Sequence, residues 1–370
     1  MMEPWYSIRN AATLDTPALV IYPENVKKNL AVLRSFAGEM QRVRPHVKTN
    51  KCPQVSRMMI DAGISKFKCA TIAEAEMLAM EKAKDVLLAY QPVGPKASRF
   101  CRLQEKYSGT VFSCLVDNQE TLKDLSRVAK ENGQQIRVFI DLNVGMNRTG
   151  IRPGKEAFEL FEQAAQSQGI EFTGLHVYDG HLRDADLKVR TQKCDDAFAP
   201  VLTLRSEIRK ATGRDPVVVA GGTPTFLIHA KRNDVEVSPG TFIFWDRGYQ
   251  QILSEQPCEF AALVVTRVIS VPDEHTVCLD LGHKSIASEN AIGQRVYLLD
   301  VQGLQPVGHS EEHMVFRSEE KHNYKTGHVI YGVPYHICPT VALYEEASVC
   351  RDHIAGDTWP IVARKRKITV

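Results

Sequence analysis

Between residues 43 and 240, short runs of apolar, mostly β-branched residues alternate with longer stretches of helical periodicity. Strands that are separated by helices usually pair in parallel, so this alternation favours an α/β fold with a parallel sheet. Eight runs over this length fit a closed (β/α)8 barrel, like the TIM barrel, better than an open sheet. The runs expected to form strands are residues 43–49, 66–71, 85–91, 110–117, 136–144, 172–180, 217–222 and 234–240.

Two of the stretches between these runs carry recognisable helix ends. Thr71 and Glu74 stand in the register of a capping box at the start of TIAEAEMLAMEKA. NQETLKDLSRVAKENG begins with Asn118, repeats apolar residues three and four apart, and ends at Gly133. These signals support helices between the expected strands.

The chain after residue 255 has a different pattern, in which short strand-like runs follow one another with turn residues between them. We therefore expect a barrel over residues 18–255 and a second, C-terminal β domain over residues 256–370, to which residues 1–17 belong. Segment 16–23, TPALVIYP, is also strand-like and could pair with that domain. The strand-like runs of the C-terminal part are residues 261–271, 275–282, 295–301, 313–318, 328–334 and 339–349.

The overall composition excludes several classes of protein. The chain is 44% hydrophobic and 24% charged with a net charge of +2, which gives no reason to expect a nucleic acid or membrane partner. No run approaches the roughly 20 apolar residues of a membrane-spanning helix. The start, MMEPWYSIRN, lacks the basic and apolar parts of a signal peptide, and the nine cysteines form no CxxC pair. We expect a cytoplasmic protein with reduced thiols.

Several polar residues fall where the functional groups of a (β/α)8 barrel lie, at the carboxyl ends of its strands. Arg44, His46 and Lys48 would share one face of an extended segment, and Lys48 would end it. A buried lysine tends to lose its proton, and a neutral amine can attack an aldehyde to form a Schiff base. The alternative is that Lys48 lies beyond the strand end in solvent. Other groups at strand ends are Arg148, Tyr178, His181, Gly221, Gly222 and Thr223.

The segment AGGTPTF, residues 220–226, follows the expected seventh strand. Paired glycines let backbone amides approach an anion, and Thr223 and Thr225 can donate hydrogen bonds as well. Phosphate sites of barrels often use the loops after the seventh and eighth strands. Gly-Gly turns are common, however, so an ordinary turn remains the alternative on this signal alone.

The segment VPYHICPT places His336 and Cys338 two residues apart. If it is a strand, the imidazole and the thiol share one face and could bind a borderline-soft ion such as zinc. The alternative is a surface histidine beside a buried cysteine. A second polar cluster, Glu311 to His313 in SEEH, is typical of a solvated surface.

Taken together, these segments resemble one known group of enzymes. RPHVKTNK, residues 44–51, is similar to the RPHxKTHK-type segment around the cofactor lysine of the D-threonine aldolase and D-serine dehydratase group, alanine-racemase-like (fold-type III) pyridoxal-phosphate enzymes. One departure is Asn50, where the group often has histidine. The resemblance continues in order through FKCATIAEAEMLA, DLNVGMNRTGI, GLHVYDGH, AGGTPTF, SPGTF, DLGHKS, SEEH and PYHICPT.

The resemblance implies a barrel plus β-domain protomer, a homodimer, pyridoxal 5'-phosphate as cofactor and a small D-amino acid as substrate. It implies that Lys48 forms the Schiff base and, with His181, takes part in catalysis. His46, Arg148 and Tyr178 would line the cofactor. The expected phosphate residues are Gly221, Gly222 and Thr223, and the expected ligands of a divalent metal (zinc, or else manganese or magnesium) are His336 and Cys338.

Two reactions remain open within this group. Segments 87–95, 142–151 and 174–181 resemble the aldolase branch, which cleaves D-3-hydroxy amino acids to glycine and an aldehyde. The His-x-Cys pair at His336 and Cys338 resembles the zinc-dependent D-serine dehydratase branch instead. We favour the D-threonine aldolase, with the dehydratase (an ammonia-lyase) as the alternative. A non-catalytic pyridoxal-phosphate carrier is a remote third reading, since such carriers lack a β domain.

Overall fold

The computed structural model describes residues 3–370 and divides the chain into two compact units. The barrel unit consists of Leu33–Lys48, Ser56–Gly240 and Lys365–Val370. The β unit consists of the chain up to Val32, Thr49–Val55 and Thr241–Arg364. These limits differ from the expected division into 18–255 and 256–370 plus 1–17, because the chain passes between the units several times. Residues 1–2 of the expected N-terminal segment lie outside the described residues.

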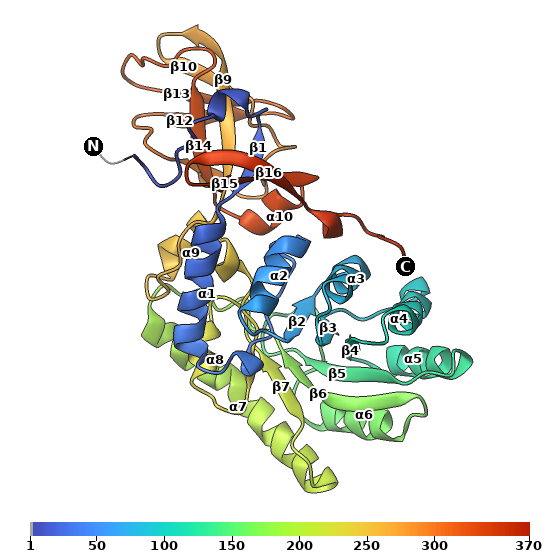
Figure 1. Cartoon of the computed structure of the whole chain (residues 1–370). Helices are drawn as coiled ribbons and strands as arrows, with labels where there is room; N and C mark the ends of the chain where they lie inside the picture. The colour runs from blue at the N-terminus through green and yellow to red at the C-terminus, as the bar shows by residue number, and fades with distance from the viewer. Residues whose placement is uncertain (1–2) are drawn as a thin grey trace. The chain divides into compact units, whose positions relative to one another are not determined.

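The barrel unit contains a curled sheet of seven parallel strands that follow one another in chain order (Figure 1). Each strand after β2 pairs in parallel with the one before it, and helices run between successive strands. The predicted α/β barrel with a separate β domain is therefore confirmed as a fold class. The strands are β2 (Lys66–Cys69), β3 (Asp85–Leu88), β4 (Val111–Val116), β5 (Ile136–Leu142), β6 (Ile170–Val177), β7 (Val217–Ala220) and β8 (Glu236–Val237).

The eighth expected strand, residues 43–49, is not a regular strand. Residues 43–48, which we call the seam, instead make isolated parallel bridges to both edge strands, Val43 with Val237 of β8 and His46 with Lys68 of β2. The backbone N–H of Arg44 donates to the carbonyl of Val237 over 2.9 Å. Pro45 has no N–H to donate, which interrupts the ladder at this point. The sheet is thus joined edge to edge by a short, irregular segment.

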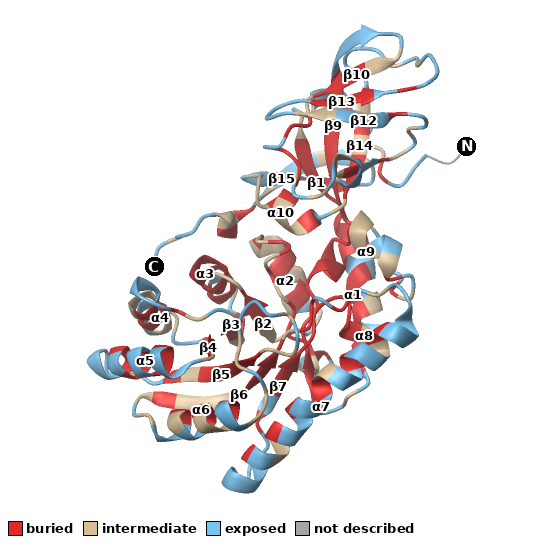
Figure 2. Cartoon of the chain, turned by 180° about the vertical axis from the view of Figure 1, so that it is seen from behind, coloured by how far each residue is buried: buried red, intermediate tan, exposed pale blue. Residues whose placement is uncertain are grey.

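Most helices of the chain have buried residues on one side and exposed residues on the other, whereas the helix at Ile72–Met80 is buried almost throughout (Figure 2). The two predicted helix starts are confirmed: the side chain of Thr71 accepts a hydrogen bond from the Glu74 amide, and that of Asn118 accepts one from the Thr121 amide. The helices along the chain are α1 (Pro23–Ala37), α2 (Pro53–Asp61), α3 (Ile72–Met80), α4 (Pro95–Lys106), α5 (Gln119–Glu131), α6 (Lys155–Gln166), α7 (Leu187–Thr212) and α8 (Phe226–Ala230).

The interior of the barrel is apolar in the middle and polar toward both ends. Leu87, Leu115, Phe139 and Val219, each from a different strand, form a buried apolar cluster. Side chains two residues apart point to the same face of a strand, so Asp141 shares the face of Phe139 on β5. The same alternation therefore puts charged side chains inside the barrel above and below the apolar layer.

The β unit is built on a nine-stranded sheet with the path β12-β13-β10-β9-β1-β15-β16, to which β14 and β11 are added beside β9. β1 pairs antiparallel with β9 and parallel with β15, which confirms that segment 16–23 pairs with the β domain. The strands are β1 (Ala18–Ile21), β9 (Ala262–Asp273), β10 (Thr276–Leu279), β11 (Val296–Leu298), β12 (Gln305–His309), β13 (Met314–Arg317), β14 (Val329–Pro334), β15 (Glu346–Arg351) and β16 (Ile354–Pro360).

One expected strand of this unit is partly helical. Residues 339–349 were expected to be extended, but the first part belongs to the short helix α10 (Ile337–Val341) and only the last part to β15. Pro339 stands in the first turn of α10, where an N–H has no acceptor within the helix, so proline is tolerated there. The remaining helix of the unit is α9 (Arg247–Ile252).

Candidate active site

The seam carries Lys48 to the carboxyl end of the barrel strands. Its side chain is half-buried, and Nζ lies 5.7 Å from the centre of the Tyr178 ring. The backbone N–H of Lys48 donates to Nδ1 of His46 over 3.2 Å. This bond leaves the proton of a neutral His46 imidazole on Nε2. Lys48 and His46 thus lie together, as the sequence predicted, while their proposed roles stay predictions.

Tyr178 is the centre of a cationic site. Besides Lys48, Nζ of Lys68 lies 5.6 Å from its ring centre, and the guanidinium carbon of Arg148 lies 5.2 Å from it. A Cβ atom added to Gly222 would lie 3.0 Å from the Tyr178 ring, so the glycine leaves room for it. Three cations around one ring create a strong local attraction for an anionic ligand.

Lys68 is the least expected member of this group, because its side chain is only 2% exposed. Its Nζ lies 3.4 Å from Nε2 of His176, and Nδ1 of that histidine lies 2.7 Å from Oδ1 of Asp141. Burial, helped by the charge of Lys48, lowers the pKa of Lys68 to about 7. Burial raises the pKa of Asp141, but hydrogen bonds from His176, Thr149 and Gln91 and the charge of His176 together outweigh it, and the net pKa is lowered.

The turn after β7 has a clear structural reason for its glycines. Gly221 has φ of +79°, a left-handed conformation that glycine adopts readily. The Gly221 amide donates to the carbonyl of Val177 over 2.8 Å, and the Gly222 amide donates to Oγ1 of Thr225 over 3.3 Å. Oγ1 of Thr223 accepts a hydrogen bond from the Gly240 amide over 3.1 Å. The turn is thus preformed, and its phosphate role remains a prediction.

A buried cluster lies behind this turn. Within residues 3–370, Asp179, Cys194 and His229 form the one group of three potential metal ligands, with ligand atoms within 4.8 Å of one another. Arg232, however, donates to Nδ1 of His229 over 2.7 Å, so the proton of the neutral imidazole is on Nε2 and is donated to Asp179 over 2.8 Å. A metal would need the lone pair of Nε2. We therefore interpret the cluster as a hydrogen-bond network, which holds the turn through Thr225.

His181 and Arg148 are both exposed and come from loops after neighbouring strands. Gly145, on the loop after β5, has φ of +119°, and a Cβ atom there would lie 2.8 Å from Nε2 of His181. The His181 ring therefore packs against the backbone of the loop that carries Arg148. The structure thus brings the predicted barrel residues Lys48, Arg148, Tyr178 and Gly222 around one point, with His181 at its rim.

The predicted metal pair lies in the β unit, but not on a strand. β14 ends at Pro334, His336 is the N-cap of α10, and Cys338 stands in the first turn of that helix. The expectation that a strand aligns the two side chains is therefore wrong, and the start of a helix brings them together instead. Oγ1 of Thr49 lies 3.1 Å from the Cys338 sulfur.

His336 has an acidic partner that the sequence did not reveal. Its Nδ1 lies 2.5 Å from Oε1 of Glu289. Burial lowers the pKa of His336, but hydrogen bonds to Cys338 and Glu289 outweigh it and raise the pKa to about 9. A carboxylate on one imidazole nitrogen typically orients the other toward a metal. An imidazole and a thiol are both donors that suit zinc.

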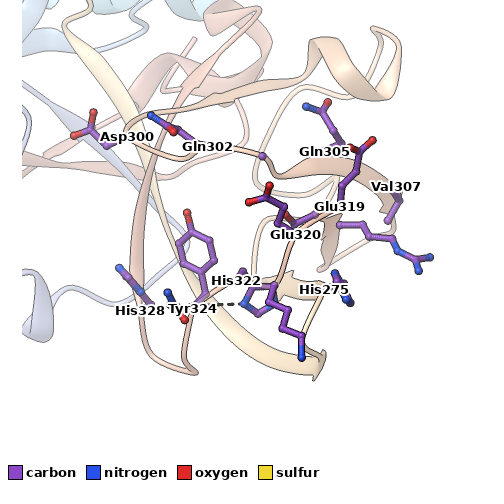
Figure 3. Close-up of a pocket in the computed structure, with 15 residues that line it drawn as sticks. His275, Asp300, Gln302, Gln305, Val307, Glu319, Glu320, His322, Tyr324 and His328 are labelled. Atoms are coloured by element: carbon purple, nitrogen blue, oxygen red, sulfur yellow. Dashed lines mark hydrogen bonds between the residues drawn. The ribbon is translucent and has the colours of Figure 1, made fainter.

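A large hollow elsewhere in the β unit, of about 1410 Å³, has a mixed lining (Figure 3). There Nδ1 of His322 accepts a hydrogen bond from the Tyr324 amide over 3.3 Å. The lining, all within the described chain, includes none of the predicted site residues, and we assign no chemistry to it. It is formed by His275, Asp300, Gln302, Gly303, Gln305, Val307, Arg317, Ser318, Glu319, Glu320, Lys321, His322, Asn323, Tyr324 and His328.

Comparisons with known proteins agree with this arrangement. The family described as "Alanine racemase, N-terminal domain" matches residues 21–248, and the one described as "Putative serine dehydratase domain" matches residues 261–350. The chain belongs to the alanine racemase N-terminal domain family. As a member of this alanine-racemase-like family it has pyridoxal phosphate as its implied cofactor, which a primary amine among cations at the barrel mouth fits.

Relatives of this alanine-racemase-like chain are enzymes. It is 27% identical to D-threonine aldolase of an Arthrobacter species over 95% of this chain and 93% of the relative. It is 26% identical to D-threo-3-hydroxyaspartate dehydratase of Delftia sp. (strain HT23) over 63% of this chain and 62% of the relative. The crystal structure of D-threonine aldolase from Filomicrobium marinum superposes with a TM-score of 0.86 at 27% identity, covering 95% of this chain and 96% of that chain. Over residues 3–370, no helix is long and apolar enough to cross a membrane.

Proposed function

We propose that the chain is a pyridoxal-phosphate- and divalent-metal-dependent lyase that cleaves D-threonine and related D-3-hydroxy amino acids to glycine and an aldehyde. The observation that carries this proposal is the position of Lys48, whose amine faces the Tyr178 ring together with Arg148. Similarity to a D-threonine aldolase over 95% of the chain supports the choice of reaction.

Pyridoxal phosphate, when bound, supplies an aldehyde for amines and a ring that takes up the electrons of the bond broken at Cα. Lys48 would attach it through Nζ, and His46, Arg148 and Tyr178 would line it. The preformed turn would hold the phosphate through Gly221, Gly222 and Thr223. This assignment explains why Lys48, Lys68 and Arg148 all lie near the Tyr178 ring.

Cleavage of a 3-hydroxy amino acid needs two proton transfers. The β-hydroxyl loses a proton as the Cα–Cβ bond breaks, and Cα then receives one to give glycine. We assign the first transfer to His181, whose imidazole is exposed at the rim of the site, and the second to Lys48. In the β unit, His336 and Cys338 would hold the divalent ion, with Glu289 orienting His336, to supply Lewis-acid chemistry at the β-oxygen. The thiol of Cys338 favours zinc over manganese or magnesium.

The alternative is a D-3-hydroxy-amino-acid dehydratase. The specific observation in its favour is the His-x-Cys pair, together with the similarity to a D-threo-3-hydroxyaspartate dehydratase. In that reaction Lys48 takes the Cα proton and the β-hydroxyl leaves as water. A non-catalytic carrier is the least favoured reading, because the chain has a whole β unit with a potential metal pair.

Product analysis tests these readings. The protein, loaded with pyridoxal phosphate, is incubated with D-threonine or D-serine with and without added zinc or manganese. Glycine and acetaldehyde from D-threonine support the aldolase, whereas 2-oxobutyrate or pyruvate with ammonia supports the dehydratase. Equal turnover of L-threonine would contradict the assigned stereochemistry. If none of these amino acids reacts, the non-catalytic carrier becomes the favoured function.

The Lys48→Ala variant tests the observation on which the proposal rests. We expect the activity to fall by about 10⁴-fold or more, the upper end of what a single proton-transfer group contributes. The visible absorbance of the Schiff base should also disappear. Lys106→Ala is the matched control, because Lys106 also lies over a tyrosine ring, at 5.4 Å from that of Tyr107, but outside the site. Unchanged absorbance in Lys48→Ala would contradict the assignment.

We further propose a cytoplasmic homodimer without a nucleic acid partner. Nine cysteines without a CxxC pair are typical of a reducing compartment, in which thiols stay reduced. The dimer rests on the family resemblance, and sedimentation of the cofactor-loaded protein tests it.

A further inference from the structure

Lys68 is a buried amine that the proposed reaction does not use, and it lies beside the amine that the reaction needs. Its Nζ approaches the Tyr178 ring to 5.6 Å, and Nζ of Lys48 approaches the same ring to 5.7 Å. Among residues 3–370, no carboxylate lies within ion-pair distance of Lys68. A lysine in such a place is held in the fold without the partner that normally stabilises its charge.

The hydrogen bonding around Lys68 has a defined direction. Asp141 accepts from Nδ1 of His176 over 2.7 Å, and its other oxygen accepts from Gln91 over 3.2 Å. With its proton on Nδ1, the neutral imidazole presents the lone pair of Nε2 to Lys68, 3.4 Å away. The chain from Asp141 through His176 thus accepts from Lys68, and it fixes the amine in place whether that amine is neutral or charged.

The charges that face Lys68 come from four directions. Lys48 and Arg44 on the seam disfavour its protonation, whereas Asp141 on β5 and Asp179 after β6 favour it. Burial is the largest influence and lowers the pKa, followed by the charge of Lys48. Since Arg44, Asp141 and Asp179 have fixed charges near neutral pH, Lys48 is the neighbour whose charge changes during a reaction.

We propose that Lys68 is a positioning residue for Lys48 that takes up one proton when Lys48 loses its positive charge. While Lys48 is an ammonium ion, repulsion and burial keep Lys68 neutral. When the proposed function converts Lys48 to an uncharged nitrogen, the repulsion ends, and Lys68 becomes an ammonium ion. The proton comes from Lys48 itself: one N–H bond breaks on the Lys48 ammonium group, one forms on Lys68, and the Lys48 amine becomes a nucleophile.

The test is a difference titration of the full-length protein without bound cofactor. The proton uptake of Lys68→Met is subtracted from that of the unsubstituted protein, and the same difference is measured in a Lys48→Met background. We expect one titrating proton with a midpoint near pH 7 in the first pair. In the second pair the midpoint should rise by at least about one pH unit, because the repelling charge is gone.

Lys66→Met is the matched control, since Lys66 lies two residues away on the same strand but forms an ion pair with Glu236. Its difference titration should have the same midpoint with and without Lys48. If Lys68→Met does not fold, Lys68→Gln, which keeps an N–H donor for His176, replaces it. A Lys68 midpoint that is the same in both backgrounds, or that lies above pH 9 in the first, would overturn the proposal.

Turnover gives a second readout. In the unsubstituted protein we expect kcat/KM with D-threonine to change with pH near pH 7. This pH dependence should disappear in Lys68→Met and remain in Lys66→Met. A Lys68→Met profile identical to that of the unsubstituted protein would contradict the proposal. The titration requires neither cofactor nor turnover. Its outcome therefore tests Lys68 even if the products turn out to be those of a dehydratase or no reaction occurs.

Discussion

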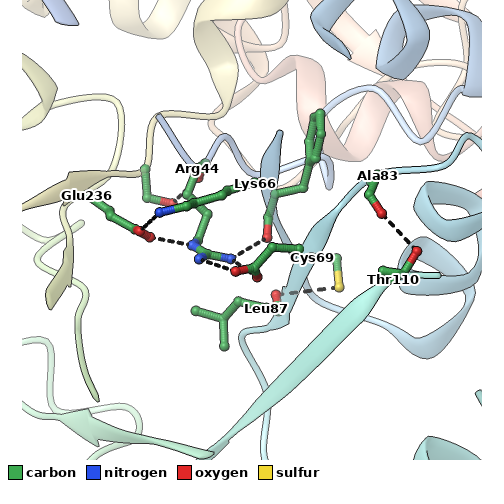
Figure 4. Close-up of polar contacts among 10 residues, drawn as sticks. Arg44, Lys66, Cys69, Ala83, Leu87, Thr110 and Glu236 are labelled. Carbon is green, nitrogen blue, oxygen red and sulfur yellow. Dashed lines mark hydrogen bonds and ion pairs between the residues drawn. The ribbon is translucent and has the colours of Figure 1, made fainter. Parts of the chain in front are cut away.

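The two ends of the barrel interior each contain a buried cation, but only one of the two is paired. Near the amino ends of the strands, Nη1 of Arg44 lies 2.6 Å from Oδ1 of Asp85, and its Nε lies 2.7 Å from Oε2 of Glu236, which Lys66 also contacts (Figure 4). Near the carboxyl ends, Lys68 is equally buried, but its Nζ lies next to the neutral His176, and no carboxylate among residues 3–370 lies within ion-pair distance of it.

This difference shows that burial alone does not fix the charge of a side chain. Burial lowers the pKa of both cations, but Glu236 and Asp85 outweigh it and raise the pKa of Arg44. For Lys68, burial and the charge of Lys48 outweigh the opposing charges of Asp179 and Asp141, and its pKa falls to about 7. The amino end of the barrel thus carries a fixed charge that serves stability, and the carboxyl end carries an adjustable charge that serves chemistry.

The largest expected effect comes from removing the paired cation, Arg44, and it tests whether this end of the barrel serves stability. Arg44→Met would leave Glu236 and Asp85 without their guanidinium at the junction of the seam with β3 and β8. We expect a loss of about 3 to 5 kcal/mol in the free energy of unfolding, the usual result of removing one partner of a buried pair. Urea unfolding measures it, with the exposed pair variant Arg127→Ala as control, for which no measurable loss is expected. A loss below about 1 kcal/mol for Arg44→Met would show that Lys66 alone compensates the carboxylates.

Removing the unpaired cation, Lys68, should increase the free energy of unfolding instead of lowering it. Lys68→Met keeps the length of the side chain without the charge, and we expect it to stabilise the fold by about 1 to 4 kcal/mol at neutral pH. The pKa of Lys68 is about 7 in the folded protein and about 10.5 for an ordinary solvated lysine, so between these values the unfolded chain binds more protons. The stability of the unsubstituted protein should therefore rise with pH across this window, and the advantage of the variant should vanish near pH 10.5.

Thermal or urea unfolding at pH 7, 8.5 and 10 measures this convergence. Lys66→Met again serves as control, because its ion pair with Glu236 gives no reason for a gain in stability. A Lys68→Met protein that is less stable than the parent at every pH would show that the amine is a structural hydrogen-bond donor rather than a destabilised charge.

The smallest expected effect concerns the histidine of the β unit, which resembles Arg44 in having a carboxylate partner. Glu289→Gln removes the charge beside His336 and keeps the shape of the side chain. We expect the affinity for zinc to fall about 10- to 100-fold, as is typical when the partner of a metal-binding histidine is changed. Competition with a chromophoric chelator measures it, with the exposed Glu312→Gln as control. An equal affinity in both variants would contradict a role for Glu289.

The sequence predicted most of the barrel because its strands are buried on both sides and read as continuous apolar runs. It failed at the seam, where Pro45 prevents a regular ladder although the segment still joins β2 and β8. It failed again at residues 339–341, where an apolar, β-branched run is helical. β12 and β16, with the sequences QPVGH and IAGDTWP, have no apolar alternation and were not expected.

The sequence predicted those site residues that lie in recognisable motifs. It missed Lys68, whose segment has the pattern of an ordinary half-exposed strand. Lys48, Tyr178 and Arg148 end strands or follow glycine-containing turns, and the structure places them together. Lys68 lies in KFKC, in which the alternation of lysine with apolar residues is typical of a strand with one solvated face. Inside a barrel that second face is also buried, so a single sequence does not distinguish a solvated lysine from an enclosed one.

The pairing of β1 determines where the polypeptide can be divided into fragments. β1 lies between β9 and β15, with Val20 opposite Leu263 on one side and Ser348 on the other. A polypeptide ending at residue 255 would keep β1 without either neighbour and present an apolar, unpaired strand to other molecules. A polypeptide starting at residue 256 would lack the strand that lies between β9 and β15. Recombination that exchanges the catalytic barrel for another one would therefore have to transfer the first 21 residues with the C-terminal part.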